Sequence, residues 1–177
     1  MPALDHLAGL FYSDLQALGA FEEVSPEATP EAYRKLLAHH EHMTVAVEQR
    51  HGCRVNVEVL AAEQTDDYYW RKIILRRQSD HSPVLFGIPR LNLRLLDEQV
   101  RSEIVSQTTP LGRVLIEHNV LREVQLASLY RITPGPDLCR LFDLPTPTTT
   151  FGRTAFIYCD GFPAVELLEI VAPEPQS

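Results

Sequence analysis

The spacing of apolar residues in the first third of the chain predicts helices. Between residues 3 and 19, leucine and phenylalanine recur every three or four positions, which is the period of one helix face. A proline-interrupted connection follows. The sequence Thr-Pro-Glu at residues 29–31 is a typical helix start, with proline in the first helical position. We expect that helix to run, with or without a break, to Gly52.

From residue 53 the apolar period changes from helical to alternating. In CRVNVEVL (53–60), valines alternate with polar side chains, which predicts a strand with one face in water. The polar stretch 61–67 should link it to a second strand at 68–77. The turn QSDHSP then leads into a third strand at 84–91, so these two strands are predicted to form a hairpin.

The second half of the chain repeats this change of period. Residues 92–107 have helical spacing, and 108–118 begin with Pro-Leu-Gly and continue as a helix or a strand. A segment rich in proline, threonine and glycine occupies 133–150. The closing sequences GRTAFIYC and PAVELLEIVAP are joined by a turn at Asp160 and Gly161, which predicts a final hairpin.

Early helices followed by hairpins predict an α+β fold with a single antiparallel β-sheet. We expect about six strands, flanked by helices. The whole chain, residues 1–177, should form one domain. Within it, residues 1–30 would be an N-terminal helix and linker, and residues 31–172 the core of the fold.

Two charged residues interrupt predicted strands whose neighbouring side chains are apolar. In YYWRKIIL, Arg71 shares a strand face with Tyr69 and Ile73. In PAVELLEIVAP, Glu169 stands between apolar residues at both i−2 and i+2. A buried charge must be paired, neutralised or bound by a ligand. The two residues therefore form either a structural ion pair or the polar ends of an apolar ligand pocket.

Composition narrows the classes of function. The chain has 177 residues, of which 45% are hydrophobic and 23% charged, and a net charge of −8 argues against a nucleic-acid partner. Three cysteines without repeated spacing indicate free thiols in a reducing compartment. The N-terminus lacks the pattern of a signal peptide, and no apolar run approaches the ~20 residues of a membrane span. We expect a cytoplasmic protein without a membrane partner.

The histidines of HHEH, with His51, raise the question of a metal site. His39 and His42 are three positions apart and would share a helix face. Further ligands with suitable spacing are absent from the sequence, so we expect a solvated polar face and no metal.

Four stretches, in this order, resemble the chorismate pyruvate-lyase (chorismate lyase) family, which converts chorismate to 4-hydroxybenzoate and pyruvate. They are HMTVAVEQRHGCRVNVEVL, YYWRKIIL, TTPLGRVL and FGRTAFIYCDGFPAVELLEIVAP. Together they span about residues 42–172. The resemblance implies a chorismate lyase-like fold with an enclosed ligand cavity.

The resemblance also implies roles for individual residues. Arg71 corresponds to the arginine that clamps the ring carboxylate, and Glu169 to the glutamate at the opposite end of the site. Leu111 corresponds to the leucine whose backbone N–H helps to hold the carboxylate, and Met43 to the methionine that covers the site. The sequence departs from the family at Ile88, where an arginine is expected, and Arg90 on the same strand face is the substitute substrate-binding residue.

The implied activity is an elimination that aromatises the ring and needs neither a metal nor an organic cofactor. It would supply 4-hydroxybenzoate for ubiquinone or secondary metabolism, with chorismate as a small-molecule partner. A monomer or small homo-oligomer is expected. Two alternatives are open: a related lyase with altered specificity, and a non-catalytic domain that senses small aromatic acids, as in a class of bacterial transcription regulators. The residues before position 42 are too few for the DNA-binding domain that precedes such sensors, and the charge is negative.

Overall fold

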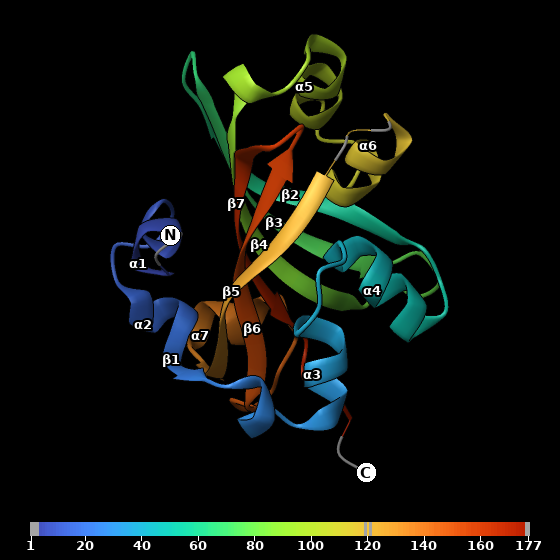
Figure 1. The fold of residues 1–177 in the computed structure, drawn as a ribbon. Coiled ribbons are helices and arrows are strands. Elements are labelled where there is room, and N and C mark those ends of the chain that lie inside the picture. Colours follow the sequence, from blue (N-terminus) through green and yellow to red (C-terminus); the bar gives the residue numbers. More distant parts are fainter. Residues whose placement is uncertain (1–3, 119, 121, 176–177) are drawn as a thin grey trace.

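A seven-stranded sheet forms the centre of the computed structural model, which describes residues 4–118, 120 and 122–175 (Figure 1). The strand order is β1-β5-β6-β7-β4-β3-β2, and each neighbouring pair is antiparallel. The predicted antiparallel sheet with flanking helices is thus confirmed, with seven strands in place of about six. The strands are β1 (Gly19–Val24), β2 (Val55–Gln64), β3 (Tyr68–Arg77), β4 (Pro83–Asn92), β5 (Arg122–Pro134), β6 (Thr150–Cys159) and β7 (Phe162–Val171).

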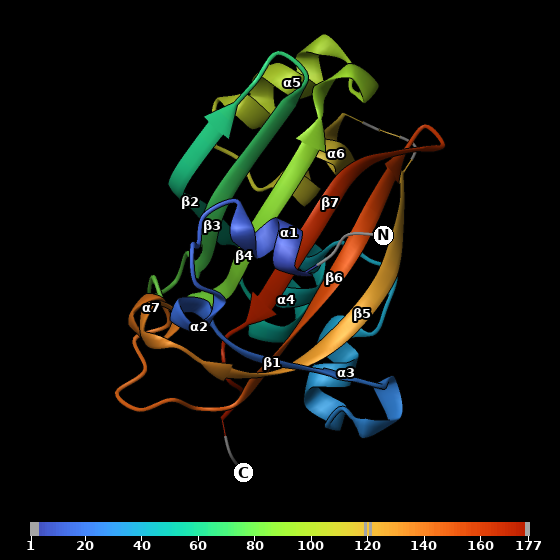
Figure 2. The same cartoon turned by 90° about the vertical axis from the view of Figure 1, so that its left-hand side faces the viewer.

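Helices cover both faces of this sheet (Figures 1 and 2). One face carries α3 (Glu31–Leu37), α4 (Met43–His51), α5 (Glu98–Val105) and α6 (Leu111–Glu117). The other carries α1 (Leu4–Gly9), α2 (Leu15–Leu18) and α7 (Pro136–Leu141). Short 3₁₀ turns, η1 (Pro26–Ala28) and η2 (Leu93–Leu95), complete the connections.

The alternation of each strand divides the core between the two faces. On β3, Ile73 and Leu75 join the cluster beneath α3 and α4, whereas Ile74 joins the cluster beneath α1, α2 and α7. On β7, Leu168 and Ile170 belong to the second cluster and Val171 to the first. A third cluster lies beneath α5 and α6 and includes Tyr69. The face assignments predicted for these strands are therefore confirmed.

The N-terminal segment differs from the prediction. The expected helix over 3–19 is two short helices, because the chain turns between them and Asp14 caps α2 by accepting a hydrogen bond from the Gln16 N–H at 3.0 Å. Residues 19–24, expected to belong to a linker, form the edge strand β1. This strand pairs with β5 from Gly19 opposite Pro134 to Val24 opposite Leu129.

The helical region expected from residue 31 to Gly52 is confirmed: a break at 38–42 divides it into α3 and α4, and Gly52, whose φ of 65° is left-handed, caps α4. Two other boundaries moved. The polar link 61–67 shortens because β2 continues to Gln64. The segment 133–150 contains α7 and the end of β5.

Two further expectations concern the cysteines and membranes. All three cysteines lie in the described residues and are free thiols, as predicted. No helix in the described part of the chain combines the length and apolar character that a membrane crossing requires.

A candidate carboxylate-binding cavity

A partly enclosed cavity lies between the sheet and the first turns of α4 and α6. The space between the protein atoms here amounts to about 510 Å³, a figure that includes space open to solvent. The centre of a water molecule fits in only about 40 Å³ of it, so the space is narrow. The walls are mostly apolar, with four polar or charged side chains that matter below: His42, Arg71, Arg153 and Glu169.

Arg71 brings a buried cation to this cavity. Its side chain is 1% exposed, on the same face of β3 as Ile73 and Leu75, which also line the space. Its Nη1 donates to the backbone oxygen of Ile104 at 3.3 Å, and its Nε has no hydrogen-bond partner among the described residues. Burial lowers the pKa of Arg71, but a guanidinium is protonated in proteins at neutral pH. A buried positive charge therefore faces the cavity without a carboxylate from the described chain.

Glu169 lines the same cavity and is paired with a different arginine. It lies directly opposite Arg153 on the neighbouring strand, and Arg153 Nε donates to the Glu169 carboxylate at 3.1 Å. Arg153 is 0% exposed and Glu169 8% exposed. Burial raises the pKa of Glu169, and the Arg153 guanidinium opposes that shift. Because β4 separates β3 from β7, two strand spacings, about 10 Å, lie between the strands of Arg71 and Glu169.

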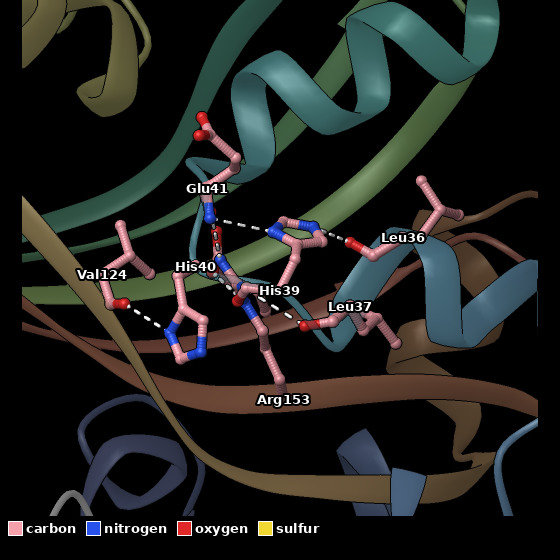
Figure 3. A network of polar contacts seen from close by, with 8 residues as sticks. Leu36, Leu37, His39, His40, Glu41, Val124 and Arg153 are labelled. Carbon is pink, nitrogen blue, oxygen red and sulfur yellow. Dashed lines mark hydrogen bonds and ion pairs between the residues drawn. The ribbon is translucent and has the colours of Figure 1, made fainter. Parts of the chain in front are cut away.

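The guanidinium of Arg153 also holds the connection between α3 and α4 (Figure 3). Its two terminal nitrogens donate to the backbone oxygens of Leu37, His39 and Glu41, at 3.2, 3.1 and 3.1 Å. His40 adds a ring-nitrogen contact of 2.9 Å with the backbone oxygen of Val124. The segment 38–42, which leads into the cavity wall, is thus fixed to β6 and β5.

Two helix N-termini close the cavity. Met43, 2% exposed, begins α4, and Leu111, 9% exposed, begins α6. The helices approach closely because Gly112 has no side chain: a Cβ there would lie 3.0 Å from His42 Cβ and from Thr44 Oγ1. No side chain among residues 4–118, 120 and 122–175 caps either helix at its N-terminus, so partial positive charge remains at this wall.

An ion pair between α4 and α6 keeps these N-termini together. Arg113 pairs with Glu48, and the second oxygen of Glu48 accepts the N–H of Val55 at 2.9 Å. Both residues belong to stretches that resemble the chorismate lyase family: Arg113 to TTPLGRVL and Glu48 to HMTVAVEQRHGCRVNVEVL. In this structure both residues position the cavity wall rather than line the cavity.

The structure brings together four of the five residues predicted for the site. Arg71, Glu169, Met43 and Leu111 all line the cavity. Arg90 does not: it lies on the other face of β4, 3.9 Å from the centre of the Tyr68 ring and 3.8 Å from the Glu166 carboxylate. The geometry therefore gives no support to Arg90 as a substrate-binding residue, because alternation turns its side chain away from Gly87 and Pro89.

Sequence reasoning missed two residues of the cavity. Arg153 shares one face of β6 with Phe151, Ala155 and Ile157. A charge on an apolar strand face is the same signal that identified Arg71. His42 is 5% exposed, and its Nε2 has no hydrogen-bond partner among the described residues. No sequence signal distinguished His42 from the histidines beside it.

The solvated polar face predicted for these histidines is wrong for His42. The chain is not helical at 38–42; His42 is buried and His39 half-buried, whereas His40 is exposed. His39 accepts the Glu41 N–H at Nδ1 at 3.0 Å and contacts the backbone oxygen of Leu36 through Nε2. Among the described residues, no group of three or more histidine, cysteine or acidic side chains is arranged to hold a metal ion.

Comparison with known proteins finds similar folds among solved structures but no match by sequence. No protein-family profile and no curated protein matches the chain. PhnF from Mycobacterium smegmatis is 13% identical, with a TM-score of 0.53 over 77% of this chain and 65% of that one. The product of gene SA0254 from Staphylococcus aureus is 8% identical, with a TM-score of 0.50 over 67% and 82% of the two chains.

A third solved structure is the ligand-binding domain of a putative GntR-family transcriptional regulator from Bordetella bronchiseptica. It is 12% identical and covers 70% of this chain and 92% of that one, with a TM-score of 0.47. The likeness to PhnF shows the fold, and the antiparallel sheet with its helices is the chorismate lyase-like fold predicted from the sequence. At such low identity the comparison establishes no function.

Proposed function

We propose that this chain binds a small cyclic carboxylic acid in the cavity, with the carboxylate on Arg71. The observation that carries the proposal is the buried Arg71 guanidinium, whose Nε has no partner among the described residues. A charge in such a place is unfavourable unless it is paired. A ligand carboxylate would pair with the Arg71 guanidinium.

The geometry of the guanidinium favours a carboxylate. Nη1 donates to Ile104 and the Tyr69 side chain interacts with the guanidinium, so Nε, which has no partner among the described residues, is the donor that a ligand carboxylate would take. Uncapped first-turn N–H groups of α6, beginning at Leu111, would add favourable charge at the same wall.

The apolar walls suit a flat ring. The cavity is narrow, and its apolar lining includes Leu75, Leu85, Val124, Ile157 and Leu167. A planar six-membered ring fills such a slot with little loss of side-chain freedom, and apolar burial favours it by about 25 cal/mol per Å².

Chorismate lyase activity is the second candidate function. The observation that favours it is the presence of Glu169 in the same cavity as Arg71, as the family resemblance implies. In that reaction Arg71 would hold the ring carboxylate while the ring C–H proton and the enolpyruvyl group leave. Glu169, paired with Arg153, would accept a hydrogen bond from a hydroxyl group at the far end of the ligand.

Calorimetric titration with benzoate and 4-hydroxybenzoate tests the proposed binding. Replacement of Arg71 by methionine should weaken binding of both acids about 10- to 100-fold, since a charge-assisted pair contributes about 1.5–3 kcal/mol. Arg90→Met is the matched control, because Arg90 sits on a neighbouring strand but faces away from the cavity. Equal affinities of the Arg71→Met and wild-type proteins for these acids would refute the proposal.

The second candidate needs a product assay. The protein is incubated with chorismate without added metal or nucleotide, and pyruvate and aromatic acid are quantified. Equal amounts of pyruvate and 4-hydroxybenzoate, lost in Arg71→Met and retained in Arg90→Met, would establish lyase activity. Binding of the acids without turnover of chorismate would establish the binding function alone.

A further inference from the structure

His42 contributes a buried imidazole to the wall of the cavity. It lines the cavity next to Met43, and it is the N-cap residue of α4 although its side chain makes no capping hydrogen bond. It is 5% exposed, and its Nε2 is buried without a hydrogen-bond partner in the described chain. A buried polar atom left unpaired is unfavourable, and native structures retain few of them.

The imidazole of His42 is uncharged at neutral pH. Burial lowers its pKa to about 4, and the positive charges of Arg122 and Arg153 act in the same direction. A neutral imidazole carries one N–H donor and one acceptor nitrogen. It can therefore donate to a carbonyl or hydroxyl oxygen, or accept a hydrogen bond from a hydroxyl group. It adds no charge to the cavity.

Among the described residues that line the cavity, Arg71 is the cation left for a ligand. Arg153 is engaged by Glu169 and by three backbone oxygens, whereas Arg71 has no carboxylate partner among the described residues. One ligand carboxylate would therefore balance Arg71. A second carboxylate near His42 would remain unpaired unless the imidazole took up a proton, which burial and two arginines oppose.

We propose that His42 determines ligand specificity: its imidazole hydrogen-bonds a neutral hydroxyl or oxo substituent of a cyclic monocarboxylic acid whose carboxylate lies on Arg71. This inference rests on the proposed function and specifies its ligand class. Selectivity arises because an acid without the substituent leaves the buried nitrogen unpaired. One net hydrogen bond of this kind corresponds to roughly a fivefold difference in affinity.

The test is a calorimetric titration at pH 7.5 with benzoate, the three monohydroxybenzoates and the dicarboxylate isophthalate. Wild-type protein should bind at least one hydroxybenzoate about fivefold more tightly than benzoate, and isophthalate more weakly than benzoate. His42→Phe keeps a ring but removes both nitrogens, and it should abolish the hydroxyl preference, measured as the ratio of hydroxybenzoate affinity to benzoate affinity. His42→Gln keeps a donor and an acceptor and should restore part of the preference.

Several outcomes would overturn the role of His42. These are a hydroxyl preference that survives in His42→Phe, an equal loss of benzoate and hydroxybenzoate binding in a His42→Phe protein whose thermal unfolding is unchanged, and tighter binding of isophthalate than of hydroxybenzoate. If His42→Phe does not fold, the same comparison is made with His42→Gln. That variant should show a smaller hydroxyl preference than wild type, and an undiminished preference would overturn the role of His42. Failure of all these acids to bind wild type, or unchanged binding in Arg71→Met, would instead refute the proposed function itself.

Discussion

Replacing Arg153 with methionine keeps a side chain of similar length but removes the charge that Glu169 and three backbone oxygens share. Glu169 would then be a buried carboxylate without its cation, and the oxygens of Leu37, His39 and Glu41 would lose their donor. Breaking a buried ion pair from one side costs about 3–5 kcal/mol. Total stabilities are commonly about 5–15 kcal/mol, so this is a large fraction.

Urea unfolding followed by circular dichroism measures the loss. For a urea m-value of about 2 kcal/mol/M, a loss of about 4 kcal/mol lowers the midpoint by about 2 M. Arg131→Met is the matched control. Arg131 pairs with Glu22 at 3.0 Å on the surface, where both side chains are substantially exposed, so its removal should cost less than about 1 kcal/mol.

The double variant Arg153→Met/Glu169→Leu separates charge from packing. It removes both buried charges and should be more stable than Arg153→Met alone by about 2 kcal/mol or more, because apolar replacements of a buried pair are often nearly neutral. Hydrogen exchange at residues 38–44 should accelerate in both variants, since both lose the donor to the loop. The reasoning is refuted if Arg153→Met lies within about 1 kcal/mol of wild type, or if the second substitution gives no recovery.

Two further predictions concern the helix N-termini at the cavity. Gly112→Ala should destabilise the fold by about 1–3 kcal/mol and weaken acid binding, because its Cβ would meet His42 and Thr44 at 3.0 Å; unchanged unfolding and titration curves would contradict this. Wild type should lose up to about 3 kcal/mol of stability relative to His42→Gln between pH 7 and pH 4. The folded-state pKa of His42, about 4, lies below its usual 6.5, so the stabilisation is present above pH 6.5 and is lost as pH falls toward 4. Parallel stability–pH curves for the two proteins would show that His42 does not titrate in this way.

The sequence alone determined the strands that build the cavity floor and the faces of their side chains. Alternation is a local property of an extended chain, so YYWRKIIL and PAVELLEIVAP already place Arg71 and Glu169 on apolar faces. The same logic applied to TFGRTAFIYC would have found Arg153. Local turn chemistry likewise indicated the hairpin at Asp160 and Gly161, whose φ angles of 51° and 85° are both left-handed.

Only the tertiary structure decided which charges meet. Strand order places β6 beside β7 and leaves β4 between β7 and β3, so Glu169 pairs with Arg153 and Arg71 keeps no carboxylate among the described residues. The burial of His42 likewise depends on α6 closing over α4 at Gly112. Partners of this kind are separated by many residues, and no local periodicity encodes which strand lies next to which. That pairing is set by the packing of the whole sheet, which is why only the fold showed that Arg71 lacks a carboxylate partner in the part of the chain that the structure describes.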